Sequence, residues 1–176
     1  MFKKGPGPKL KKKGKAMKIN ILRAILIALL ITQMWIIFGF SGQNGDESGS
    51  ISRKITEAVT KNISSIQNLE KEEKEEVLRK IEHIIRKLAH FSLYAVIGIL
   101  LMSLMSTYKI KQKNRILVSS SIGLLYAISD EIHQAFIPGR GPQITDVGID
   151  FAGVVVGMGI ALVVIRFYTN KMAKMM

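Results

Sequence analysis

The apolar residues of this chain fall into four long runs separated by polar segments. Each run approaches or exceeds the roughly 20 residues that a helix needs to cross about 30 Å of hydrocarbon. Backbone polar groups find no water there, so helices are the only plausible spanning form. The predicted spans are residues 20–40, 88–105, 116–136 and 147–167. The pattern predicts an all-α fold, a small integral membrane bundle with about four transmembrane helices. A soluble bundle is the alternative, although buried helices of this length are unusual there.

Basic residues gather beside the span ends that share one side of the membrane. The net charge is +13, and residues 1–18 contain eight lysines and no acid. Two further basic groups occupy residues 109–115, between the second and third spans, and residues 166–174. By the positive-inside tendency this side is cytoplasmic. We therefore expect a plasma-membrane protein with a disordered cytosolic arm (1–18), a transmembrane domain (19–168), a cytosolic tail (169–176) and both termini in the cytoplasm.

Several classes of protein and function are disfavoured by the sequence. Without cysteine the chain has no disulfide, thiolate metal site or cysteine nucleophile. A cleaved signal peptide over residues 1–43 conflicts with the long apolar run and the lack of an A-x-A-like site. No glycine-rich phosphate loop follows a strand, and no internal repeat supports a transporter. The basic arm suits anionic inner-leaflet lipids better than nucleic acid, so membrane lipids, and not nucleic acid, are the expected partner. No cofactor is expected.

Residues 41–87 form the predicted extracytoplasmic segment, in which nine basic and nine acidic residues balance. Apolar residues recur at helical spacing from Ile51 to Ile66, and again from Val77 to Leu88, which predicts two short amphipathic helices. The charged run EKEEKEE in the second helix forms a solvated face. Alternatively, both helices lie on the outer leaflet and cover a site below.

Polar residues also interrupt the predicted spans, and they do so at helical spacing. The three faces are Lys87, His90, Tyr94 and Gly98 on the second span; Ser119, Gly123, Tyr126, Asp130 and Gln134 on the third; and Asp146, Asp150, Gly153 and Gly157 on the fourth. Neighbouring helical residues point about 100° apart, so Asp130 rather than Glu131 should share the face of Gln134. Because these span ends lie on the same side, we expect their polar residues to meet in one extracytoplasmic layer.

Two connecting segments add residues to this layer. Glycines and prolines dominate IPGRGPQIT between the last two spans, a turn that would present Arg140 back over the acids. Its guanidinium is a planar fork suited to carboxylate or phosphate. After the first span, turn-forming residues place Ser41 and Gln43 on an expected loop at the outer surface. In the fourth span, Gly153 and Gly157 form a GxxxG motif that lets another helix approach closely.

This collection of groups is a workable general acid/base set. In an enzyme, His90 or Asp130 would be the base, Glu131 and Asp146 further catalytic candidates, and Lys87 with Arg140 an anion clamp. Ser41 is a candidate nucleophile without a signature of activation. The alternative is a structural network in which the cations neutralise the acids and fix helix register. Metal binding by His90 with Asp130 or Asp146 is disfavoured by the nearby cations, and His83 and His133 are expected to be ordinary.

At these residues the chain resembles the VanZ-like family of small membrane proteins. The matching elements are Phe40, Ser41 and Gln43; Lys87, His90 and Tyr94; Asp130, Glu131, Gln134, Phe136, Pro138 and Arg140; and Asp146, Asp150, Gly153 and Gly157. The resemblance covers residues 19–168, and it departs at Asp150, where the family usually has asparagine. It implies an envelope protein, with teicoplanin resistance as the family's named phenotype.

The sequence thus leads to one main functional hypothesis and one rival. An extracytoplasmic polar site recognises a lipid or cell-wall component and thereby reduces susceptibility to lipoglycopeptides. Its partner would be a lipid-linked cell-wall precursor or the lipoglycopeptide itself. The residues expected to bind this component are Ser41, Gln43, Lys87, Tyr94, Gln134, Arg140 and Asp150. The rival is a membrane-embedded hydrolase or transferase acting on a lipid-linked substrate.

Overall fold

The computed structural model describes residues 8–42, 45–138, 141 and 143–175, and within them the chain forms helices and no strand. The helices are α1 (Pro8–Ser41), α2 (Gly45–Thr60), α3 (Ser64–Gln67), α4 (Lys71–Ser106), α5 (Gln112–Gln134) and α6 (Ile144–Met175). The predicted all-α class is therefore confirmed.

Three of the described helices are long and apolar enough to cross a membrane: α1 from Ala16 to Ser41, α4, and α6. The sequence predicted about four such helices, and α5 is the one that falls short. Its apolar residues are interrupted by Ser119, Ser120 and Ser121 and, near its end, by Asp130 and Glu131. These polar residues lower its mean hydropathy although the helix itself is 23 residues long.

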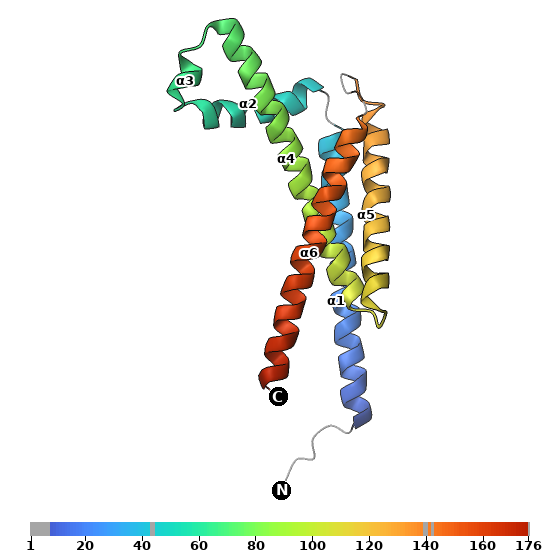
Figure 1. Cartoon of the computed structure of the whole chain (residues 1–176). Coiled ribbons are helices and arrows are strands. Elements are labelled where there is room, and N and C mark those ends of the chain that lie inside the picture. The colour runs from blue at the N-terminus through green and yellow to red at the C-terminus, as the bar shows by residue number, and fades with distance from the viewer. Residues whose placement is uncertain (1–7, 43–44, 139–140, 142, 176) are drawn as a thin grey trace.

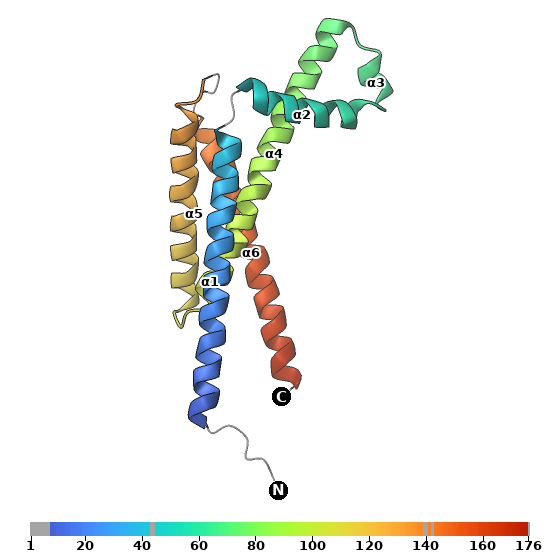
Figure 2. The ribbon, with the colours of Figure 1, turned by 180° about the vertical axis from the view of Figure 1, so that it is seen from behind.

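The four long helices run lengthwise beside one another, and the beginning of α1 and the end of α6 lie at the same end of this bundle (Figure 1). The opposite end carries α2, α3 and the beginning of α4, which extend beyond the bundle (Figure 2). Arg53 of α2 contacts Glu75 of α4 at 3.1 Å, and Ser52 donates a hydrogen bond to Glu82. This projecting part is thus tied together by polar contacts.

Helix α4 differs from the prediction because it is continuous over 36 residues. The sequence predicted an amphipathic helix followed by a span that starts near Leu88. Between Lys71 and Ile97 the chain has no glycine or proline, so nothing breaks the helix where its surroundings change. In the preceding segment, the predicted helix through Ile66 instead ends at Thr60, and a short helix restarts at Ser64.

Helices α4 and α6 pack backbone to backbone through glycines. A Cβ atom added to Gly98 would lie 2.1 Å from the carbonyl oxygen of Val154, and one added to Gly157 would lie 1.8 Å from that of Ala95. Gly153 has the same relation to Phe91, at 2.3 Å. The predicted close approach at the GxxxG motif is confirmed, and it brings the polar residues of the two helices into register.

The outer surface of the bundle is apolar. Trp35, Leu125 and Val163 are 74%, 66% and 69% exposed, respectively. Apolar surface on this scale is unfavourable in water and marks a membrane-facing or interacting surface. The fully buried residues, which include Tyr94, Ile97 and Val154, form a narrow core between the helices. This distribution is the one expected of a small helical membrane protein.

Candidate functional site

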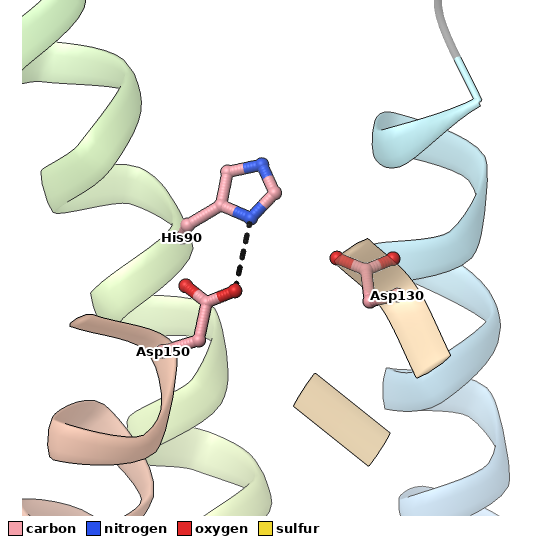
Figure 3. Close-up of side chains that lie close together, drawn as sticks. All are labelled: His90, Asp130 and Asp150. Atoms are coloured by element: carbon pink, nitrogen blue, oxygen red, sulfur yellow. Dashed lines mark ion pairs between the residues drawn. The ribbon is translucent and has the colours of Figure 1, made fainter. Parts of the chain in front are cut away.

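The polar ends of four helices meet at the end of the bundle from which α4 projects. Lys87 of α4 forms an ion pair with Asp146 of α6, with Nζ 2.7 Å from Oδ1. One turn further along both helices, Nδ1 of His90 lies 3.9 Å from Oδ2 of Asp150 (Figure 3). The helical spacing of these residues therefore places two pairs, each of a basic and an acidic side chain, on consecutive turns between α4 and α6.

Asp130 joins this layer from α5. Its Oδ2 accepts hydrogen bonds from Ser41 Oγ of α1 at 2.9 Å and from Gln134 Nε2 at 3.0 Å. Asp130 is 3% exposed, so one donor from α1 and one from its own helix hold a buried carboxylate in one orientation. Gln134 shares a helical face with Asp130, as the sequence predicted.

Ser41 does not occupy the predicted surface loop. It is the last residue of α1 and is fully buried. The helix continues through Phe40 and Ser41, and the hydroxyl turns inward toward Asp130 instead of outward to solvent. Gln43 and Arg140, the other residues expected from the connecting segments, lie outside the described residues.

Glu131 is also buried but points elsewhere. Its Oε1 accepts a hydrogen bond from the backbone N–H of Gln143, one residue before α6 begins. Adjacent helical residues face different directions, and here Glu131 holds the segment between α5 and α6. Among the described residues it forms no hydrogen bond with the cluster around Asp130.

Two tyrosines lie beneath the polar layer. The Tyr94 ring is fully buried, with its centroid 5.8 Å from that of Tyr126. The Tyr126 hydroxyl donates a 2.6 Å hydrogen bond to the carbonyl oxygen of Met34. Tyr126 therefore connects α5 to α1, whereas Tyr94 remains among the acids, interacting electrostatically with Asp130 and Asp150.

A cleft of about 170 Å³ opens above these pairs. One wall comes from α4, and the other comes from α6, the segment before it and Gln134 at the end of α5. The lining residues are His83, Arg86, Lys87, His90, Gln134, Gly141, Gln143, Asp146, Ile149 and Asp150. The cleft is thus lined by cationic and imidazole groups on one side and by carboxylates on the other.

On the α4 wall of the cleft, His83 and Arg86 were not among the site residues predicted from the sequence. His83 was expected to be ordinary. Together with Lys87 and His90 they are spaced i, i+3, i+4 and i+7, which places all four on one face of a helix. This helical spacing is visible in the sequence and could have identified both residues. The other histidine set aside, His133, stacks on the ring of Phe38 with centroids 4.1 Å apart and takes no part in the cleft.

One family model, described as VanZ/LLP1, matches residues 26–166. This range includes most of the chain and all the helices that form the cleft. The chain belongs to the VanZ/LLP1 family. No curated protein and no solved structure matches it significantly.

In this VanZ/LLP1 protein the site offers two kinds of chemistry. Lys87 and Arg86 can donate charge-assisted hydrogen bonds to an anion. Deeper in the layer, His90, Asp130 and Asp150 contribute one donor atom each, and these three atoms lie within 4.8 Å of one another. Such a group can exchange protons or hold a cation.

Proposed function

We propose that the cleft binds the anionic head group of a lipid or lipid-linked cell-wall component at the outer leaflet of the plasma membrane. The observation that carries this proposal is the wall of four side chains on α4, His83, Arg86, Lys87 and His90, at one end of an apolar bundle. A phosphate at membrane depth needs such donors because water is scarce there.

In this proposal α5 is a fourth membrane span. Its 23 residues reach about 35 Å, enough for a hydrocarbon core of about 30 Å. Four spans put both termini on one side, and the described basic residues Lys13, Lys109 and Lys174 belong to segments at that side. The positive-inside tendency makes it cytoplasmic, so the cleft faces outward and the projecting part with α2 and α3 lies outside the cell.

The opposite wall of the cleft narrows the class of head group. Asp146 and Asp150 accept hydrogen bonds but, when ionised, donate none. A head group with a phosphate for the α4 wall and hydroxyl or ammonium donors for the α6 wall would satisfy both walls. Lipid-linked sugar phosphates have this combination of groups. Binding or masking such a component would reduce susceptibility to lipoglycopeptides such as teicoplanin, as the family resemblance implies.

The test compares two pairs of substitutions on α4 in purified full-length protein in lipid nanodiscs. The site variant is Arg86→Gln with Lys87→Gln, and the matched control is Arg79→Gln with Lys80→Gln on the exposed part of the same helix. The probe is a fluorescent polyprenyl diphosphate, with labelled phosphatidylcholine as the neutral reference. We expect the site variant to bind the probe at least roughly tenfold more weakly, since one charge-assisted hydrogen bond contributes about 1.5–3 kcal/mol. Equal binding by the site and control variants would contradict the proposal.

A membrane-embedded hydrolase or transferase is a second candidate, favoured by the hydrogen bond from Ser41 to Asp130. A carboxylate positioned in this way can accept a hydroxyl proton. Ser41 is fully buried, so a substrate would reach it only after the helix ends separate. Chemical analysis of the same probe after incubation distinguishes the two functions. A new species that disappears with Asp130→Asn supports the enzyme, and an unchanged probe supports the binding protein.

A further inference from the structure

The deepest part of the polar layer contains a compact group of metal-ligating side chains. His90 of α4, Asp150 of α6 and Asp130 of α5 each place one nitrogen or oxygen within 4.8 Å of the other two. Figure 3 shows the three side chains in the space between these helices, with Asp130 across from the His90–Asp150 pair. Three different helices thus contribute to one point.

The two carboxylates of this group lack a cationic partner other than His90 among the described residues. Asp130 and Asp150 are each 3% exposed. No described lysine or arginine lies within ion-pair distance of either, because Lys87 pairs with Asp146. Two buried carboxylates close together are costly unless a cation or a proton neutralises them. The position between them is therefore suited to a positive charge.

Oδ1 of Asp130, a buried oxygen at the same place, accepts no hydrogen bond of normal geometry within the described part of the chain. The hydroxyl of the fully buried Tyr94 interacts with the same carboxylate and can donate to it. The other oxygen of Asp130 is held by Ser41 and Gln134. Hydrogen bonds that orient a ligating carboxylate while leaving its second oxygen available are typical of the outer shell of a metal site.

We infer that His90, Asp130 and Asp150 bind a divalent transition-metal ion, with Zn²⁺ or Mn²⁺ as the chemical class. Imidazole and carboxylate donors suit these ions. Donor atoms bound to one Zn²⁺ at about 2.1 Å lie roughly 3.4 Å apart in a tetrahedron. The 3.9 Å between Nδ1 of His90 and Oδ2 of Asp150 is close to that value. The donor atoms of the group lie within 4.8 Å of one another, so small side-chain rotations would bring all three to this spacing.

The ion would be reached from the cleft, since His90 and Asp150 also line it. Three protein ligands leave a coordination position open, as in zinc sites that bind water or substrate. A metal ion there would add positive charge beneath the anion-binding wall. Metal binding does not depend on the proposed lipid recognition, and it is measured without lipid probe, so either proposal can fail alone.

The experiment measures Zn²⁺ binding to the full-length protein in detergent, purified through a tag without histidine and stripped with a chelator that is then removed. Calorimetric titration should give one tight Zn²⁺ per chain. His90→Ala and the isosteric Asp150→Asn should each weaken binding by roughly tenfold or more. His133→Ala removes an imidazole that stacks on Phe38 outside the cleft and should leave Zn²⁺ affinity unchanged.

Two results would overturn the inference: no stoichiometric Zn²⁺ or Mn²⁺ binding by the wild-type protein, or equal affinity in the wild type and in folded Asp150→Asn. Helix content by circular dichroism establishes that each variant is folded. If His90→Ala does not fold, Asp150→Asn decides the question alone, because it removes a ligating charge without changing side-chain size.

Discussion

Lys87 and Asp146 connect α4 to α6 through a contact of 2.7 Å between side chains that are 25% and 30% exposed, respectively. Replacing Lys87 with glutamine leaves Asp146 partly buried without its cation. We expect this change to lower the free energy of unfolding by about 1.5–3 kcal/mol, the usual contribution of a hydrogen bond to a charged group. Unfolding of the purified protein in mixed micelles measures it.

The control for this prediction is Lys80→Gln. Lys80 contacts Glu76 at the same distance of 2.7 Å, but the two side chains are 70% and 62% exposed. Exposed ion pairs contribute little because water screens them, so no change is expected. If both substitutions have the same effect, the Lys87 pair has no special role in joining the helices.

Helical spacing alone identified much of this site. Lys87, His90 and Tyr94 share the face of α4 that meets Asp146 and Asp150, as their positions in the sequence indicated. The spacing could not show that Ser41 turns inward, because the end of α1 depends on a contact with Asp130 from a residue 89 positions away. His83 and Arg86 were missed because an amphipathic, charged segment is also typical of a solvated face.

At the level of whole elements, the packing of α4 against α6 depends on Gly157. A methyl group there would overlap the carbonyl of Ala95, whereas a methyl group added at Gly159 on the same helix would meet no atom of another element within 4 Å. Gly157→Ala should therefore separate the helices and destabilise the protein by about 1–3 kcal/mol, a typical effect of overpacking. The midpoint of thermal unfolding in detergent should fall clearly.

Gly159→Ala is the matched control on α6. Alanine favours a helix over glycine by up to about 1 kcal/mol, so this variant should be as stable as the wild type or slightly more stable. An unchanged midpoint for Gly157→Ala would show that the two backbones are not in contact there.

The boundaries of the elements were harder to predict than their existence. The hydrophobic pattern changes near Leu88, but the backbone has no reason to break, so α4 passes through the change as one helix. In contrast, Lys61 and Asn62 interrupt a segment whose isoleucines continue at helical spacing to Ile66. Apolar periodicity describes which face is buried, and local backbone preferences decide where a helix ends.

For the whole molecule, the beginning of α1 and the end of α6 lie at the same end of the bundle (Figure 1), which is the arrangement that the proposed four spans require. Three of the described helices are apolar enough to span, and α5 is less so because it contributes Ser119, Asp130 and Glu131 to the interior. Polar residues of this kind lower the mean hydropathy of a helix, and membrane spans are identified by high hydropathy. The sequence therefore predicted the helical class well and the number of spans less directly.

Single-cysteine labelling determines on which side of the membrane the cleft opens, which we propose to be the outer side. The chain has no cysteine, so His83→Cys at the cleft rim and Lys109→Cys between α4 and α5 each introduce one exposed thiol. A membrane-impermeant maleimide should label the cysteine at position 83 in intact cells and the one at position 109 only after permeabilisation. Labelling at position 109 but not at 83 in intact cells would place the cleft on the cytoplasmic side and contradict the proposed orientation.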